Sequence, residues 1–224
     1  MVKALALEQI IGKKSHELDE KTLRDKARGL SSVVVDFGCG DGMLPYRLAK
    51  QNPDTFYIGI DAAREPLAVA SAKAAKKPTR GGCDNAVFLC ADVLTPMPGL
   101  DGIADELHWH FPWGSLMYAL LRAEIPAMAS MRAVGKDGAK FEFFLNLYVF
   151  ENATQREDMG LPEVDEPFIE KTLIPAWRGS GFHVKRHSFL RSDQLKEHPS
   201  TWAGRLVRRS GRNTLFMQGE VQHA

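Results

Sequence analysis

The sequence predicts an α/β fold in which helices flank a seven-stranded, mostly parallel sheet with an antiparallel last strand. Three apolar, β-branched runs each end in an acidic residue or glycine: SSVVVDFG at 31–38, TFYIGID at 55–61 and AVFLCAD at 86–92. Such runs are typical of buried parallel strands. Between them, residues 44–52 and 64–77 have helical spacing and good helix formers. We therefore expect a βαβαβ unit in the first half of the chain.

The second half repeats the alternation of strand and helix signals. After the βαβαβ unit we expect, in order, a strand at 104–111, a helix at 115–131, a strand at 139–150, a helix at 167–181, and strands at 182–190 and 213–222. The last two strands are close in sequence and are expected to pair antiparallel at one edge of the sheet.

Length and composition indicate one soluble domain. The 224 residues suit a single domain over 1–224, with an N-terminal extension of about 1–30 and an inserted acidic loop at about 151–166. No apolar run approaches the ~20 residues needed to cross a bilayer, and the N-terminus lacks a signal-peptide pattern, so we expect a cytoplasmic protein without membrane contact. The three cysteines include no CxxC pair, which argues against disulfides and a zinc site; we expect no metal.

The DFGCGDG motif after the first predicted strand indicates a ligand site. Its glycines are spaced GxGxG, whereas NAD-binding loops usually have GxGxxG. The carboxylate of Asp36 would repel a pyrophosphate but would attract the ammonium group of S-adenosylmethionine. With Gly38 and Gly40 forming the turn, Asp61 is placed to accept the ribose hydroxyls and Asp92 to accept the adenine amine. The alternative is that the glycines only form a tight turn and the acids only cap helices.

This order of strand, acid and GxGxG, followed by a second strand ending in an acid, resembles the Rossmann-like class I S-adenosylmethionine-dependent methyltransferases. In that fold, the loop after the fourth strand lies beside the methyl group to be transferred. Here that loop is FPWG, in which Trp113 offers a flat surface on which a nucleobase can stack. Pro112 restricts Phe111, so the loop is expected to be pre-shaped. The alternative for Phe111 and Trp113 is a role as core filler.

Charge is unevenly distributed although the net charge is only +1. Residues 151–170 carry seven acids, whereas residues 183–212 are rich in bases, including Arg205, Arg208 and Arg212. A second acid-free patch contains Lys73, Lys76, Lys77 and Arg80; the three lysines are spaced i, i+3 and i+4, so we expect them on one face of the helix after the second strand. The alternative is that these basic residues are simply exposed to solvent, but the presence of two such patches favours contact with RNA phosphates.

Four segments together resemble a narrower family. YIGID, KKPTRGG, FPWGSL and STWAGRL are similar to segments of the 16S rRNA adenine-N1 methyltransferases of the KamB and NpmA type, which confer resistance to kanamycin and apramycin. The resemblance implies methylation of adenine 1408 in helix 44 of the 30S subunit, with the flipped base held between Trp113 and Trp202. It also implies a pocket near the methionine moiety or the target lined by Ser115 and Ser200, and rRNA contacts by both basic patches.

The expected chemistry needs no general base. Adenine N1 has an in-plane lone pair and no proton, so it can attack the methyl group directly; the task is to position the extruded base. We therefore expect structural roles for His108, His110 and His183, and a monomer acting on the ribosomal subunit.

Three alternatives stay open at this point. The tRNA guanine-N7 methyltransferases share a YIGI-like strand and a Pro-Trp pair, but they usually have an acid before that pair and basic residues after it. A non-catalytic ribosome-binding factor could retain the fold. An NAD-dependent dehydrogenase is disfavoured by the GxGxG spacing.

Overall fold

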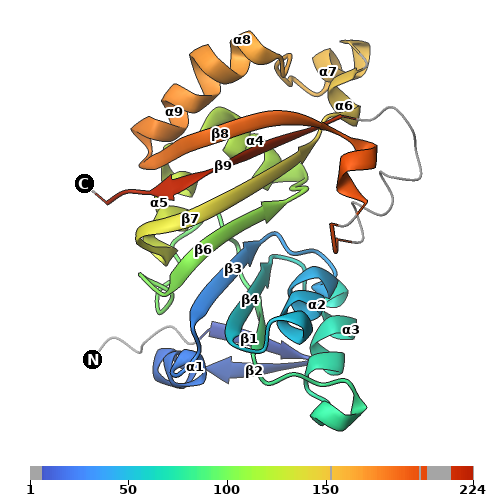
Figure 1. Cartoon of the computed structure of the whole chain (residues 1–224), viewed down its shortest axis with the longest axis vertical. Helices are drawn as coiled ribbons and strands as arrows, with labels where there is room; N and C mark the ends of the chain where they lie inside the picture. The colour runs from blue at the N-terminus through green and yellow to red at the C-terminus, as the bar shows by residue number, and fades with distance from the viewer. Residues whose placement is uncertain (1–6, 152, 197, 201–212, 224) are drawn as a thin grey trace.

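One mixed sheet runs through the protein (Figure 1). The computed structural model describes residues 7–151, 153–196, 198–200 and 213–223. These residues form a nine-stranded sheet of order β2-β1-β5-β4-β3-β6-β7-β9-β8. The strands are β1 (Leu7–Ile11), β2 (Lys14–Leu18), β3 (Ser32–Phe37), β4 (Thr55–Asp61), β5 (Ala86–Cys90), β6 (Ala104–His110), β7 (Gly135–Asn146), β8 (Phe182–Arg191) and β9 (Asn213–Val221).

The predicted α/β fold is confirmed, and the central strands β5, β4, β3, β6 and β7 are parallel. The last strand, β9, is inserted between β7 and β8 and is antiparallel to both, so β8 is the edge strand. The expected total of seven strands was wrong, because residues 7–18 form a hairpin that pairs antiparallel with β5. Part of the expected N-terminal extension therefore belongs to the sheet.

Helices lie on both faces of the sheet (Figure 1). Alternate residues of β3 point to opposite sides: Val35 and Phe37 enter the main core, whereas Val34 packs with Ala49 of the helix after β3. The helices are α1 (Glu20–Ala27), α2 (Met43–Gln51), α3 (Arg64–Ala74), α4 (Gly114–Arg122), α5 (Ile125–Val134), α6 (Tyr148–Glu151), α7 (Ala153–Asp158), α8 (Glu166–Phe168) and α9 (Ile174–Gly179).

Several predicted helix boundaries differ from the structure. The single helix expected at 115–131 is two helices, because Ala123 adopts a left-handed conformation with φ +48° between them. The helix expected at 167–181 contains a π-helical segment at Ile169–Leu173. Pro175 follows this segment and lacks the N–H that a regular α-helix would use there.

The end of the fifth predicted strand and the acidic loop also differ. Strand β7 ends at Asn146 rather than at 150, and α6 follows it. The expected acidic loop at about 151–166 contains α7.

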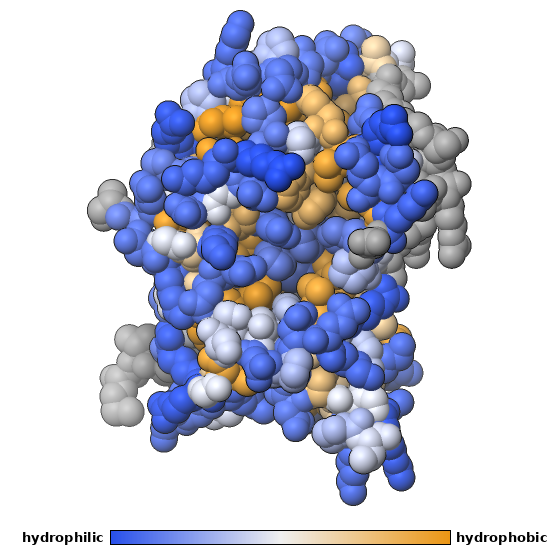
Figure 2. Space-filling model, in the orientation of Figure 1, coloured by the Kyte–Doolittle hydropathy of each residue, from blue (hydrophilic) through white to orange (hydrophobic). Residues whose placement is uncertain are grey.

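Polar side chains cover most of the face shown in Figure 2, and apolar side chains appear mainly in hollows between them. Among the described residues no helix is long and apolar enough to cross a membrane.

Candidate functional site

A cavity of about 230 Å³ opens at the carboxyl ends of the parallel strands β3, β4 and β5. Ligands of open α/β sheets usually bind at this edge. The cavity is lined by Gly38, Gly40, Asp61, Ala62, Asp92, Val93, Leu94, Phe111, Trp113, Ser115 and Leu116. Seven of these residues were candidates from the sequence, so the structure brings most of the predicted donor and acceptor residues together.

The glycine loop after β3 has a backbone that only glycine adopts without strain. Gly38 has φ +68°, and a Cβ atom there would lie 2.6 Å from Cδ2 of Leu116. Gly40 has φ +59° and nothing within 4 Å of its Cβ position. Its N–H donates to Oδ2 of Asp61 at 2.8 Å. The two glycines therefore let the loop pass close to the cavity and tie it to the end of β4.

Most N–H groups of this loop donate within the protein. The amides of Gly38 and Cys39 donate to the carbonyl of Ile60 at 2.8 and 3.0 Å. At the start of α2, the Met43 amide donates to Oδ1 of Asp41 at 3.0 Å. An anion site needs free donors at a helix N-terminus. The loop is therefore poorly suited to a pyrophosphate, which disfavours a dinucleotide.

Asp36 lies behind the cavity lining rather than in it. The residue is 4% exposed, and its Oδ1 has no hydrogen-bond partner among the described residues. Strand β3 continues one residue beyond it, to Phe37, and Asp36 is in register with His108 of β6. Burial raises the pKa of Asp36 to about 7; the Asp61 charge adds to this rise and His108 opposes it. A cationic group near the cavity would stabilise the ionised form.

Three carboxylates give this end of the sheet a negative potential. Burial, together with the charges of Asp36, Asp61 and Asp41, raises the pKa of the Cys39 thiol well above its usual value. The thiol is therefore protonated. These carboxylates and the unpartnered oxygen of Asp36 fit a ligand with cationic groups, as S-adenosylmethionine has at its ammonium and sulfonium.

The remaining donor-site candidates lie at different depths. Oδ1 of Asp61 accepts from the Ala63 amide at 2.9 Å, and Oδ1 of exposed Asp92 accepts from the Leu94 amide at 3.0 Å. Ser115 is exposed and lines the cavity. Ser200 is buried and is not among the lining residues.

The aromatic loop after β6 combines one exposed ring with one buried ring. Trp113 is 60% exposed at the cavity and precedes the first residue of α4. Phe111 is 8% exposed and packs against Phe144, whose carbonyl accepts from the Phe111 amide at 2.8 Å. Phe111 has φ +60°, a strained conformation for a non-glycine residue, and Pro112 is buried. Phe111 is thus both a core residue and a lining residue, and it fixes the loop that presents Trp113.

The first basic patch is a turn, not a helix face. Helix α3 ends at Ala74, so the expectation that Lys73, Lys76 and Lys77 share its face was wrong. Lys76, Lys77 and Arg80 are exposed on the following turn, whereas Lys73 is half-buried. The turn is closed by backbone hydrogen bonds from the Cys83 amide to the Ala74 carbonyl and from Gly82 to Lys77.

Four candidates cannot be placed: Trp202, Arg205, Arg208 and Arg212 lie outside the described residues. Conversely, sequence reasoning missed Ala62, Val93, Leu94 and Leu116 as lining residues. Only their positions in the chain could have indicated them. Ala62, Val93 and Leu94 follow predicted strands, and Leu116 lies in the first turn of a helix, all at the same edge of the sheet.

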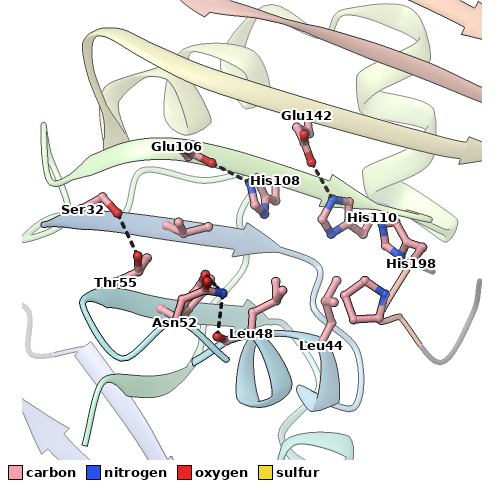
Figure 3. Close-up of a pocket in the computed structure, with 13 residues that line it drawn as sticks. Ser32, Leu44, Leu48, Asn52, Thr55, Glu106, His108, His110, Glu142 and His198 are labelled. Carbon is pink, nitrogen blue, oxygen red and sulfur yellow. Dashed lines mark hydrogen bonds and ion pairs between the residues drawn. The ribbon is translucent and has the colours of Figure 1, made fainter. Parts of the chain in front are cut away.

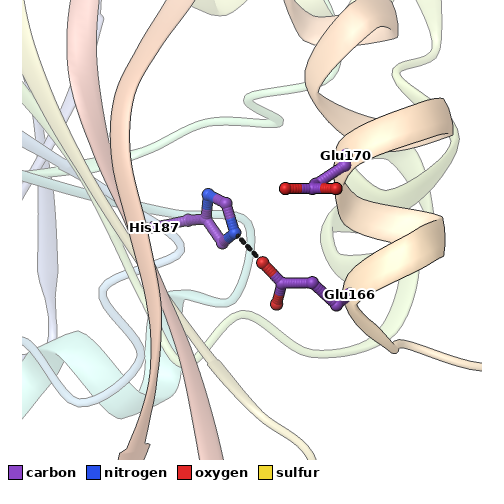
Figure 4. A group of neighbouring side chains, drawn as sticks. All are labelled: Glu166, Glu170 and His187. Atoms are coloured by element: carbon purple, nitrogen blue, oxygen red, sulfur yellow. Dashed lines mark hydrogen bonds and ion pairs between the residues drawn. The ribbon is translucent and has the colours of Figure 1, made fainter.

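One group of carboxylate and imidazole side chains in the described part of the chain is close enough to share a metal ion. It comprises Glu166, Glu170 and His187, with potential ligand atoms within 4.8 Å of one another (Figure 4). The His187 Nε2 already lies 2.6 Å from Oε1 of Glu166, and both glutamates are exposed. The hydrogen bond between His187 and Glu166 accounts for their approach, and exposed carboxylates are common at a protein surface, so we assign the group no metal.

Comparison with known proteins gives a consistent result. A family model described as NpmA, 16S rRNA (adenine(1408)-N(1))-methyltransferase, matches residues 8–221. A 16S rRNA (adenine(1408)-N(1))-methyltransferase from Streptoalloteichus tenebrarius is 30% identical over 200 residues, which cover 89% of this chain and 92% of the relative.

Two solved structures share the fold over nearly the whole chain. The 16S rRNA methyltransferase KamB has a TM-score of 0.87 and 29% identity, covering 97% of this chain and 100% of that one. A tryptophan-to-alanine mutant of the 16S rRNA (adenine(1408)-N(1))-methyltransferase from Catenulisporales acidiphilia, with cosubstrate SAM, has a TM-score of 0.85 and 26% identity, covering 97% and 98%.

Proposed function

This chain belongs to the 16S rRNA (adenine(1408)-N(1))-methyltransferase family, and on that premise we propose that it methylates N1 of adenine 1408 in helix 44 of 16S rRNA. It is an S-adenosylmethionine-dependent enzyme. Its substrate is the assembled 30S subunit, on which it acts as a monomer in the cytoplasm. The product protects the ribosome from kanamycin and apramycin.

The donor is held by carboxylates. Asp36 attracts the ammonium group from behind the glycine loop, Asp61 accepts the ribose hydroxyls, and Asp92 accepts the adenine amine. The hydrogen bonds of the loop support this assignment. The amides of Gly38, Cys39 and Gly40 already donate to protein acceptors, and a cosubstrate without phosphates does not need them as donors. Bound S-adenosylmethionine would supply an electrophilic methyl group.

The observation that carries the proposal is the exposed ring of Trp113 on the same cavity as Asp61 and Asp92. A tryptophan that is 60% exposed beside such a cavity offers its face to a planar group, and stacking contributes about 1–3 kcal/mol per base. The family resemblance makes Trp202, which lies outside the described residues, the partner of Trp113 in holding the flipped adenine. Phe111 and Pro112 hold the Trp113 loop in shape before the substrate arrives.

The reaction needs positioning rather than proton transfer. The adenine N1 lone pair forms the new N–C bond while the C–S bond to the methyl group breaks, and no proton leaves. The protein therefore extrudes the base, excludes water and aligns N1 with the methyl group. Neither a general base nor a metal ion is needed for this step.

Basic side chains bind the rRNA backbone. Lys76, Lys77 and Arg80 project from a turn that is fixed to α2, because the Tyr46 hydroxyl donates to the Gly81 carbonyl at 2.7 Å. A fixed turn loses little freedom when it binds phosphates. Half-buried Lys73, near the end of α3, is a further phosphate contact in this proposal, as are Arg205, Arg208 and Arg212, which lie outside the described residues.

Transfer of tritium from labelled S-adenosylmethionine tests the proposal. Purified 30S subunits, 50S subunits and tRNA are incubated separately with the protein. We expect label in 30S subunits alone. Label in tRNA would support the guanine-N7 alternative, and binding to 30S subunits without label would indicate a non-catalytic factor.

A further inference from the structure

The two histidines that flank Trp109 on β6 have no role in the proposed chemistry. Trp109 points into the main core, where its ring stacks on Phe37 at 5.5 Å. His108 and His110 line a second cavity, of about 280 Å³, between β6, β7 and α2 (Figure 3). The His110 side chain is 5% exposed, and neither ring nitrogen has a hydrogen-bond partner among the described residues; Oε2 of Glu142 is 3.6 Å from Nε2.

His198 packs on this buried ring from a distant part of the chain. The two imidazole centroids are 5.0 Å apart with an interplanar angle of 89°. The same His198 ring lies 4.8 Å from the ring of Phe144 and 5.7 Å from the ring of Phe111. His198 therefore contacts both the end of β6 and the residue that shapes the Trp113 loop.

The short segment 198–200 is fixed by further contacts. Nη1 of Arg47, on α2, donates to the Pro199 carbonyl at 2.7 Å. The Ser200 amide donates to Nδ1 of His198 at 3.2 Å. Immediately upstream, Leu195 belongs to the apolar cluster of Phe111, Phe144 and Phe216. These contacts tie the segment to α2, and Leu195 ties the chain just before it to the Phe111 cluster.

Both imidazoles are uncharged at neutral pH. Burial lowers the pKa of His110 to about 3 and that of His198 to about 4. The charged or titratable groups that face them are His108 from β6 and Glu142 from β7. The two rings therefore pack as neutral aromatic groups, for which an edge-to-face contact is favourable.

We propose that His198, held by the ring of His110, is a positioning residue that fixes segment 198–200 against the Trp113 loop and so sets the geometry of the acceptor site. The inference rests on the proposed function, in which the base is gripped by Trp113 and by Trp202, two residues beyond Ser200. His198 touches no reacting atom. It acts through Phe111, which lines the cavity and shapes the Trp113 loop.

Three variants separate this role from a general effect on the fold. His198→Ala removes the ring, His198→Phe keeps an aromatic ring without nitrogens, and His16→Ala removes an exposed histidine of the β1–β2 hairpin as a matched control. Calorimetry gives the affinity for S-adenosylmethionine, and steady-state methylation of 30S subunits gives kcat and KM. Circular dichroism reports folding.

The ring contact predicts a selective loss. His198→Ala should lower kcat/KM for 30S subunits by about 10- to 100-fold, because small misplacements of reacting groups are costly, while donor affinity stays within about twofold. His198→Phe should recover activity to within about threefold of the wild type, and His16→Ala should match it. His110→Ala should resemble His198→Ala, and the double variant should be little worse than either, since the two act as one unit.

Four results would overturn the inference: wild-type turnover in His198→Ala, a parallel loss of donor affinity, equal impairment of His198→Phe and His198→Ala, or fully additive losses in the double variant. Failure of the proposed function is distinguishable, because the wild-type protein would then leave 30S subunits unmethylated.

Discussion

Donor binding should depend on pH through Asp36, a residue that is 4% exposed and whose carboxyl has a pKa of about 7 in the free protein. The ammonium of S-adenosylmethionine gains its electrostatic contact only with the ionised carboxylate. The competent fraction of the protein is then about 0.09 at pH 6.0 and about 0.76 at pH 7.5, and the apparent Kd scales inversely with this fraction. The donor should therefore bind about eightfold more weakly at pH 6.0.

Isothermal titration at the two pH values measures this ratio. The donor's own ammonium, with a pKa of about 7.8, is about one-third deprotonated at pH 7.5, which reduces the expected ratio to about sixfold. The groups that face Asp36 include His108, whose own pKa is raised by Glu106 and Glu142 against the effect of burial, and Asp61. Protonated His108 lowers the pKa of Asp36, so its charge favours the ionised carboxylate and partly offsets the loss of binding at pH 6.0.

Asp36→Asn keeps the shape but removes the titration, and exposed Asp54→Asn serves as a matched control. Asp36→Asn should bind weakly at pH 7.5, with little further loss at pH 6.0, whereas Asp54→Asn should keep the wild-type ratio. A flat affinity in the wild type, or an unchanged ratio in Asp36→Asn, would refute the role given to this carboxylate.

Three further predictions concern the acceptor site, the basic turn and the buried histidines. Trp113→Ala should lower kcat/KM for 30S subunits by about 5- to 150-fold, from the loss of one stacking contact, without changing donor affinity. The control is Ile125→Ala, which removes another exposed apolar side chain. A parallel loss of donor binding in Trp113→Ala would argue against separate donor and acceptor roles. Lys76→Glu should weaken 30S binding and reduce the slope of log K, the association constant, against log salt concentration by about 1. Exposed Lys171→Glu is the control, and equal slopes for the two variants would count against the turn as a phosphate contact. His110 has a folded pKa of about 3, below its unfolded value of about 6.5, so its contribution to stability is lost as pH falls below about 6.5. His110→Phe should therefore show a smaller decrease in Tm between pH 7.5 and 5.0 than the wild type, and an equal decrease would contradict the assignment.

The central strands were predictable because strands that are buried on both faces have continuous runs of apolar, β-branched residues. The expected strand at 55–61 matches β4 from end to end. The β1–β2 hairpin was missed because the signal of an edge strand is weak: four of the five residues of β2 are exposed, and its backbone pairing with β1 leaves no apolar pattern.

The end of α3 was mispredicted for a different reason. Residues 73–77 are good helix formers, but Pro78 disfavours a helical conformation at Lys77, which has φ −58° and ψ +145°. The Gly82 and Cys83 amides donate to the carbonyls of Lys77 and Ala74 and close the turn. The proline was therefore a local stop signal that the helix propensity of the lysines and alanines outweighed in the prediction.

At the site, the residue types at the strand ends predicted where the cavity lies, but not how deeply each residue is buried. Asp36 was expected to face the ligand directly, yet it is buried and not among the lining residues, and the alternation of side chains in β3 puts it on the same face as Val34. His198 gave no signal at all, because its contacts with His110 and Phe111 are made across many residues of chain.

Reverse transcription of 16S rRNA tests the central claim most directly, since a methyl group on N1 blocks base pairing and stops the copy beside the modified base. Wild-type protein with S-adenosylmethionine and 30S subunits should give a strong stop next to adenine 1408, which Trp113→Ala weakens and omission of the donor abolishes. Full-length copies through this position from subunits that have incorporated label would contradict the account.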